Sequence, residues 1–245
     1  MTVQTVQSPQ KGPLASGVDD LRCLHRRHGS RELLRKVAGR ARSAAFSREE
    51  IVVLRKDLRD VTEMEFSESL RIEELRPDDL PALFEFNRRR CDSKANARAV
   101  NDVTQGYRGY ADYVGDELVG YYWWVDRQIE PRHRDIENYG LEIDLEDRAV
   151  YGFDFFLLEE HRGGGNSVEF LHKVETRLRD LGYETLWGYV VADNRPARWL
   201  YSMRGYQPVR KVAARRVLTR RVAIGSESEV LEARTPGAGA PVAPS

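Results

Sequence analysis

The chain has 245 residues, of which 41% are hydrophobic and 32% are charged, and its formal net charge is zero. This composition is typical of a globular protein with one sizeable core, and it excludes a chain that is mostly disordered. The balanced charge favours neither nucleic acid nor a membrane surface as a partner, and no apolar run reaches the length of a membrane span. The two cysteines, Cys23 and Cys91, show no disulfide-framework spacing, and the N-terminal residues lack the apolar segment of a signal peptide, so we expect a cytoplasmic protein.

Composition along the chain predicts four regions. The two ends, residues 1–18 and 225–245, are rich in small residues, polar residues and proline, and we expect them to be disordered. Residues 19–60 are predicted to form a basic N-terminal extension. Residues 61–224 are predicted to form the main domain.

The sequence patterns in the first half of the chain predict both strands and helices. Apolar residues at helical spacing predict a cationic amphipathic helix over 30–41, and a strand begins at Glu50, which we expect at a sheet edge. A second strand begins at Ser69. A helix follows Pro77, because a proline and two aspartates suit its first turn, and another helix is predicted over 95–103.

The second half alternates strand and helix more regularly. Two β-rich runs around a Gly-Asp pair at 115–116 predict a hairpin, and an acidic insert covers residues 129–147. The run "AVYGFDFFLLEE" from Ala149 is the strongest strand in the chain. A helix over 168–181 ends at Gly182, and strand, helix and strand follow. This order predicts an α/β protein with a mixed sheet.

The stretch "HRGGGNS" places three glycines between a strong strand and a strong helix. At a helix N-terminus, glycines expose free N–H groups at the positive end of the helix dipole, which favours an anion such as a phosphate. No Lys-Ser/Thr pair follows, which excludes a P-loop. Val168 stands where a dinucleotide-binding fingerprint needs glycine.

Two blocks of the chain resemble the GNAT family of N-acyltransferases. The first resembles the family's coenzyme A loop, Arg/Gln-x-x-Gly-x-Gly/Ala, and departs from it at its last two positions; it comprises Arg162, Gly163, Gly164, Gly165, Asn166 and Ser167. The second, "NRPARWLYSMRGY", resembles the family's Asn-x-x-Ala-x-x-x-Tyr-x-x-x-Gly-Phe/Tyr helix through Asn194, Ala197, Tyr201, Gly205 and Tyr206. The resemblance covers about residues 150–208.

The resemblance implies a mixed, mostly antiparallel sheet of about six to seven strands flanked by helices. It also implies direct transfer of an acyl group, most often acetyl, from coenzyme A to a primary amine of a small molecule, with no metal. The strand ending at Leu157 and Leu158 would splay from its neighbour and bind the pantetheine arm. The N–H groups of residues 163–167 would bind the pyrophosphate beside Arg162. The resemblance also implies that Asn194 contacts the coenzyme.

The same resemblance implies catalytic residues. Tyr201 takes the position of the acid that protonates the departing thiolate, and a phenol holds its proton at neutral pH. We expect Asp154 as the general base, because partial burial among neighbouring phenylalanines would raise its pKa. Carboxylates of the acidic insert are alternatives: Glu142, Asp144 and Glu146.

The acceptor side would be formed by the hairpin and the acidic insert. Of the four aromatic residues at 121–124, we expect two in the core and two in a cleft, whose aromatic and acidic entrance would favour a cationic amine. His172 is expected at the surface. Two alternative functions stay open: acyl transfer from a longer acyl donor or an acyl carrier protein, and a non-catalytic module that binds coenzyme A or a partner. The oligomeric state also stays open, with a homodimer as one option. No nucleic-acid partner is expected.

Overall fold

A computed structural model describes residues 20, 22–23, 25–26, 30, 46–66, 70–92, 94–128, 136, 139–217 and 220–227. Most of the predicted cationic helix, and the predicted disordered segments up to residue 18 and beyond 227, lie outside the described residues.

The helices and strands follow the predicted order. In chain order they are β1 (Phe46–Asp57), β2 (Arg71–Glu74), α2 (Leu80–Arg89), α3 (Lys94–Thr104), β3 (Arg108–Val114), β4 (Glu117–Asp126), β5 (Ala149–Leu157), α5 (Asn166–Asp180), β6 (Thr185–Val191), α6 (Arg195–Met203), β7 (Gln207–Val217) and β8 (Arg220–Glu227). Short 3-10 helices cover Leu58–Asp60, Pro77–Asp79 and Glu159–His161. Because β8 reaches Glu227, the first residues of the predicted tail belong to a strand.

Eight strands of the described residues form one mixed sheet in the order β2-β3-β4-β5-β6-β1-β7-β8, and only the β5–β6 pair among them is parallel. The α/β class and the mostly antiparallel sheet are therefore confirmed. The expected edge position of the first strand is wrong, because β1 lies between β6 and β7. The physical reason is that β1 is apolar on both faces: Ile51 belongs to one core and Val52 to the other. Such a strand needs cover on both sides.

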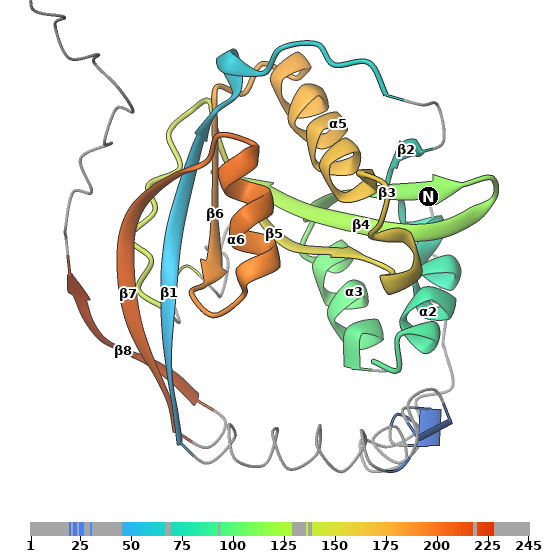
Figure 1. Cartoon of the computed structure of the whole chain (residues 1–245), viewed down its shortest axis with the longest axis horizontal. Helices are drawn as coiled ribbons and strands as arrows, with labels where there is room; N and C mark the ends of the chain where they lie inside the picture. The colour runs from blue at the N-terminus through green and yellow to red at the C-terminus, as the bar shows by residue number, and fades with distance from the viewer. Residues whose placement is uncertain are drawn as a thin grey trace, which may run out of the picture.

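The sheet separates two hydrophobic cores, with α2 and α3 on one face and α5 and α6 on the other (Figure 1). Successive side chains of a strand point to opposite faces, and β4 shows this directly. Tyr121 and Trp123 pack in the α2–α3 core, whereas Tyr122 and Trp124 pack in the α5–α6 core. All four are at most 3% exposed, so the expected division into two core and two cleft residues is wrong.

The described part of the acidic insert folds back onto the α2–α3 core. Tyr139, Leu141 and Ile143 are buried there, while the acidic residues between and after them are exposed. Arg210 of β7 binds Glu142 and the carbonyl of Leu141. The insert is therefore a structural cover of the sheet, with its carboxylates on the outer side.

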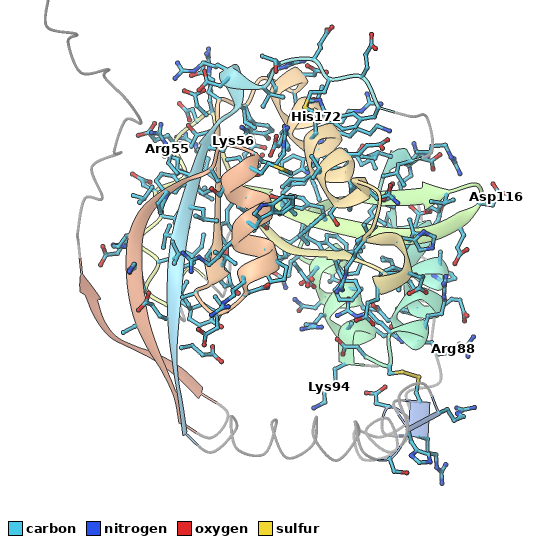
Figure 2. The ribbon with its side chains drawn as sticks, in the orientation of Figure 1. Arg55, Lys56, Arg88, Lys94, Asp116 and His172 are labelled. Carbon is cyan, nitrogen blue, oxygen red and sulfur yellow. A yellow bond between two sulfur atoms is a disulfide. The ribbon has the colours of Figure 1, made fainter. Side chains whose placement is uncertain are left out.

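Cys23 and Cys91 form a disulfide, with their Cα atoms 5.7 Å apart (Figure 2). This corrects the sequence-based reading of two cysteines that do not pair. Their separation of 68 positions along the chain gives no local signal, because the pairing depends on where the N-terminal extension meets the end of α2.

Candidate active site

Strands β5 and β6 diverge in the middle of the sheet. Residues 149–151 of β5 pair in parallel with 185–187 of β6. Beyond this stretch, β5 stays paired with β4 as far as Leu157, whereas β6 stays paired with β1 as far as Val191. The facing backbone groups therefore have no strand partner within the described residues, and the two strands separate (Figure 1). The divergence that the resemblance implies is present.

Asp154 lies in a β-bulge of β5, next to this divergence. Trp123 of β4 is opposite Phe153, but Tyr121 is opposite Phe156, so β5 has one extra residue between the two pairs. Asp154 has a φ of 48°, and its side chain is exposed. The expected partial burial of this carboxylate is wrong, because the bulge turns the residue toward solvent.

The glycine loop connects the 3-10 helix at the end of β5 with α5. Gly164 and Gly165 have φ angles of 64° and 89°, a left-handed conformation that strains any residue with a side chain. The N–H of Asn166 donates to the carbonyl of Gly163 at 3.2 Å. Four other N–H groups have no backbone acceptor in the described part of the chain: those of Gly163, Gly164, Gly165 and Ser167. The N-terminus of α5 and the loop before it thus have four N–H groups without a backbone acceptor, a feature that suits an anion.

The end of β5 turns one residue toward the divergence. The N–H of Leu158 donates to the carbonyl of Val119 on β4 at 2.9 Å, so the backbone groups of Leu157 face the other way, toward β6. The Nε of Arg162 donates to the carbonyl of Leu157 at 2.8 Å, and its guanidinium lies 5.1 Å from the centre of the Phe156 ring. Of the two predicted pantetheine contacts, Leu157 is therefore the one whose backbone faces the divergence, and its carbonyl is occupied by Arg162, which fastens the loop to β5.

Tyr201 lies on α6 and packs against the α5–α6 core. The side chain of Asn194 caps this helix by accepting from the N–H of Ala197 at 3.3 Å. The Tyr206 ring meets Tyr201 edge-on with centroids 4.8 Å apart, and the N–H of Tyr206 donates to the Tyr201 carbonyl at 3.0 Å. Burial, and next the negative charge of Glu175, raise the pKa of the Tyr201 phenol well above its usual value. Tyr201 therefore holds its proton at neutral pH.

A buried ionic cluster holds the C-terminal end of α6. Glu175 of α5 is fully buried and accepts from Arg204 at 2.5 Å, and Arg204 also contacts Nδ1 of His172 at 2.7 Å. Lys56 of β1 donates to the carbonyl of Arg204 at 2.5 Å. His172 is 5% exposed, so its predicted surface position is wrong. Burial, and next the charge of Arg204, lower the pKa of His172 to about 4, so the ring is neutral and accepts the bond.

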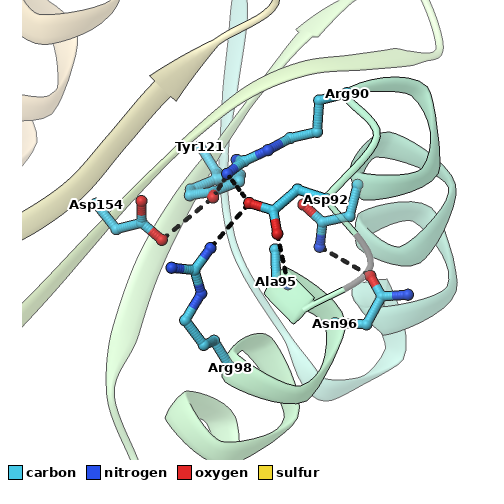
Figure 3. Close-up of polar contacts among 8 residues, drawn as sticks. Arg90, Asp92, Ala95, Asn96, Arg98, Tyr121 and Asp154 are labelled. Atoms are coloured by element: carbon cyan, nitrogen blue, oxygen red, sulfur yellow. Dashed lines mark hydrogen bonds and ion pairs between the residues drawn. The ribbon is translucent and has the colours of Figure 1, made fainter. Parts of the chain in front are cut away.

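On the opposite face of the sheet, Asp154 belongs to a second polar network (Figure 3). The Tyr121 hydroxyl donates to Asp154 at 3.2 Å and accepts from Arg90 at 2.6 Å. Arg90 and Arg98 both donate to Asp92, at 2.8 and 3.1 Å. The network therefore joins the bulge of β5 to the junction of α2 and α3.

The model of the acetyltransferase (GNAT) family matches residues 69–206, which is more than half of the chain. This chain belongs to the GNAT family. The match includes both blocks that resemble the family, and it begins after β1. No curated protein sequence matches the chain.

One of the solved structures similar to this chain supports a GNAT fold, and two others show weaker similarity. A glucosamine N-acetyltransferase region of a fungal multi-domain β-N-acetylglucosaminidase is 13% identical, with a TM-score of 0.50 over 77% of this chain and 22% of that one. A functionally unknown protein from Staphylococcus epidermidis is 16% identical (TM-score 0.49, 73% of this chain and 64% of that one). A GCN5-related N-acetyltransferase from Sphaerobacter thermophilus is 15% identical (TM-score 0.47, 80% and 57%). The chain spans less than two thirds of each.

Among the described residues of this GNAT chain, no group of three or more His, Cys, Asp or Glu side chains is arranged to hold a metal ion. No helix of the described part is long and apolar enough to span a bilayer.

Sequence reasoning missed the two polar networks of the GNAT chain. Glu175 and His172 occupy helix positions next to polar neighbours, and their partner Arg204 lies about thirty residues further along the chain. Arg90 and Arg98 read as ordinary helix charges. A signal was available for Glu175, because it lies three to four residues from apolar Leu171 and Leu178, on the inner face of α5.

Proposed function

We propose that this chain is an N-acyltransferase that moves an acetyl group from acetyl-CoA to the primary amine of a small molecule by direct transfer. The observation that carries the proposal is the position of the glycine loop, at the N-terminus of α5 and directly after the strand that diverges from β6. Free N–H groups there suit a pyrophosphate, and the unpaired edge of β5 suits the amide groups of a pantetheine arm. The acyl donor is a co-substrate, and the proposal includes no metal.

In the proposed reaction, the amine nitrogen attacks the thioester carbonyl, the new C–N bond forms and the C–S bond breaks. Tyr201 donates its proton to the departing thiolate sulfur, a role supported by its protonated phenol. Asp154 accepts the proton that the amine loses. Its exposed position on the bulge beside the divergence supports this role.

The alternative bases on the acidic insert have less support. Glu142 is paired with Arg210, and Asp144 and Glu146 are exposed on the outer side of the insert. Asp154 is the carboxylate that lies on β5 itself, so we assign the general base to it.

A turnover assay tests the proposal. The purified chain is incubated with acetyl-CoA and a panel of primary amines, and free coenzyme thiol and the mass of the acetylated product are measured. We expect thiol release that depends on the amine. Octanoyl-CoA and an acetylated carrier protein replace acetyl-CoA in parallel arms. If coenzyme A binds but no donor is turned over with any amine, the chain is a non-catalytic binding module.

A cytoplasmic location and a homodimer remain part of the proposal. The cytosol keeps most thiols reduced, so a Cys23–Cys91 disulfide in the protein as isolated would argue against a cytoplasmic location. Thiol titration of the protein as isolated from its source compartment distinguishes a dithiol from a disulfide, and light scattering gives the oligomeric state.

A further inference from the structure

We infer that the acceptor amine belongs to a free amino acid, whose carboxylate binds Arg98 and whose amino group lies beside Asp154. This inference rests on the proposed function, because it names the acceptor of that reaction. It is drawn from the polar network of Figure 3, which we call the bulge network: Arg90, Asp92, Arg98, Tyr121 and Asp154.

Two members of the bulge network, Arg90 and Asp92, form the inner pair, and their polar groups are engaged in structural contacts. The side chain of Arg90 is 11% exposed, and its guanidinium lies 3.9 Å from the centre of the Phe156 ring. It donates to the Tyr121 hydroxyl and to Asp92, as given above. Asp92 also accepts from the N–H of Ala95 at the start of α3. Arg90 and Asp92 therefore cancel each other's charge and fix the geometry of the network.

The other two charged members, Arg98 and Asp154, form the outer pair, and both side chains are partly or largely open to solvent. The side chain of Arg98 is 39% exposed and has one partner among the described residues, Asp92. Asp154 is exposed, and its one hydrogen-bond partner in the described part of the chain is Tyr121. Arg98 and Asp154 both point toward the Tyr121 hydroxyl in Figure 3, yet they form no ion pair with each other within 4.0 Å. One positive and one negative group thus lie near each other without cancelling directly.

Backbone strain marks the same place. Three described non-glycine residues have a positive φ: Cys91, Glu142 and Asp154. Asp154 belongs to the bulge network, and Cys91 lies in the chain between Arg90 and Asp92, with a φ of 57°. Left-handed backbone at residues other than glycine is costly and concentrates at functional sites. Two of the three described non-glycine residues with a positive φ therefore lie in the bulge network or next to it in the chain.

A zwitterion complements an open arginine beside an open carboxylate. An ammonium group favours Asp154, while a carboxylate fits the planar fork of Arg98 in a two-bond contact. An amine without a carboxylate would leave Arg98 with Asp92 as its one anionic partner among the described residues, and a polyamine would meet a like charge there. The geometry therefore favours a free amino acid over the cationic amine that the acidic insert suggests from sequence.

Binding of free amino acids to the full chain saturated with coenzyme A tests this inference. Isothermal titration uses the twenty common amino acids, each next to its amide, which keeps the side chain and lacks the negative charge. We expect at least one amino acid to bind tenfold or more tightly than its amide. In Arg98→Gln this preference should fall at least tenfold, while the rise in thermal midpoint caused by acetyl-CoA stays unchanged. Lys94→Gln, which removes a positive charge from an exposed position of the same helix, is the matched control and should bind as wild type.

The possible results separate this inference from the proposed function. Failure of every amino acid to bind, equal binding of acid and amide, or full binding by Arg98→Gln overturns the inference, and acetylation of any amine still leaves the proposed function intact. Selective, Arg98-dependent binding without turnover keeps the amino acid site and overturns the proposed function.

Discussion

Gly152 lies against the hydroxyl of Tyr122, at the point where β5 leaves β6. A Cβ atom on residue 152 would overlap that hydroxyl and would lie 2.5 Å from Cζ of the same ring. Tyr122 is 3% exposed and packs in the α5–α6 core. The missing side chain therefore lets a large aromatic ring pack directly beneath the start of the divergence.

The substitution Gly152→Ala should destabilise the protein and disturb the divergence, because the buried ring has no room to move. Overpacking of this kind costs about 1–3 kcal/mol. Thermal unfolding measures the loss, and the midpoint shift caused by acetyl-CoA reports the damage to the divergence. Gly188→Ala on β6 is the matched control, since its nearest new contact is an ordinary 3.5 Å. Equal effects of the two substitutions would contradict this account.

The glycine loop gives a second matched pair. Gly165→Ala places a side chain at a φ of 89°, a strain of roughly 1–2 kcal/mol, and should weaken acetyl-CoA binding by distorting the N-terminus of α5. Gly163→Ala has open space around its new Cβ atom, and its φ is not in the left-handed range. We therefore expect the coenzyme-induced midpoint shift, measured from each variant's own midpoint, to shrink for Gly165→Ala alone. Loss of the shift in both variants would mean that the space above residue 163 is also occupied by ligand.

Tyr201→Phe should lower kcat by on the order of 100-fold, because the thiolate then leaves without its proton donor. The KM for acetyl-CoA and the coenzyme-induced midpoint shift should change little. Tyr206→Phe is the control, since it removes a buried phenol whose ring contacts Tyr201. Similar losses of kcat in both variants would assign the effect to packing of α6 and remove Tyr201 from the proton-donor role.

Asp112 makes stability depend on pH. This β3 residue is fully buried, and burial raises the pKa of its carboxyl from 3.8 to about 7. The nearby charge of Lys173 only partly offsets this effect. Because the pKa is higher in the folded state, ionisation opposes folding. The penalty is absent below pH 3.8, grows between that value and pH 7, and is complete above it.

Asp112→Asn should therefore stabilise the protein more at pH 8 than at pH 5, by roughly 3 kcal/mol at about 1.4 kcal/mol for each pH unit between pH 5 and the folded pKa. Urea unfolding at the two pH values measures the difference. Asp116→Asn, at the exposed turn of the same hairpin, should show no such difference. A gain for Asp112→Asn that is independent of pH would show that its carboxyl is not neutral in the folded protein.

Local signals in the sequence were sufficient for most of the fold. Asn194 does begin α6, Gly182 follows the end of α5 with a φ of 91°, and the glycines do precede α5. These features depend on neighbouring residues alone, because caps and turns are made within a few positions of the chain. The coenzyme loop could be located for the same reason.

The bulge at Asp154 had no such signal. Residues 155–158 are all apolar, so either alternation of inward and outward side chains satisfies both cores, and the sequence does not reveal the extra residue. The interior position of β1, the Cys23–Cys91 disulfide and the Glu175–Arg204 ion pair all depend on segments that are distant in the chain. Long-range pairing of this kind leaves no local pattern.

In the proposed function, the glycine loop and the divergence of β5 from β6 together bind an acyl-CoA thioester. The most direct test is the thermal midpoint of the purified chain with and without acetyl-CoA and free coenzyme A. A ligand at 100 times its Kd stabilises the native state by about 2.7 kcal/mol, which raises the midpoint by roughly 5–10 °C for a chain of this size. We predict such a rise with acetyl-CoA, larger than the rise with free coenzyme A. An unchanged midpoint with every thioester at millimolar concentration would contradict the account.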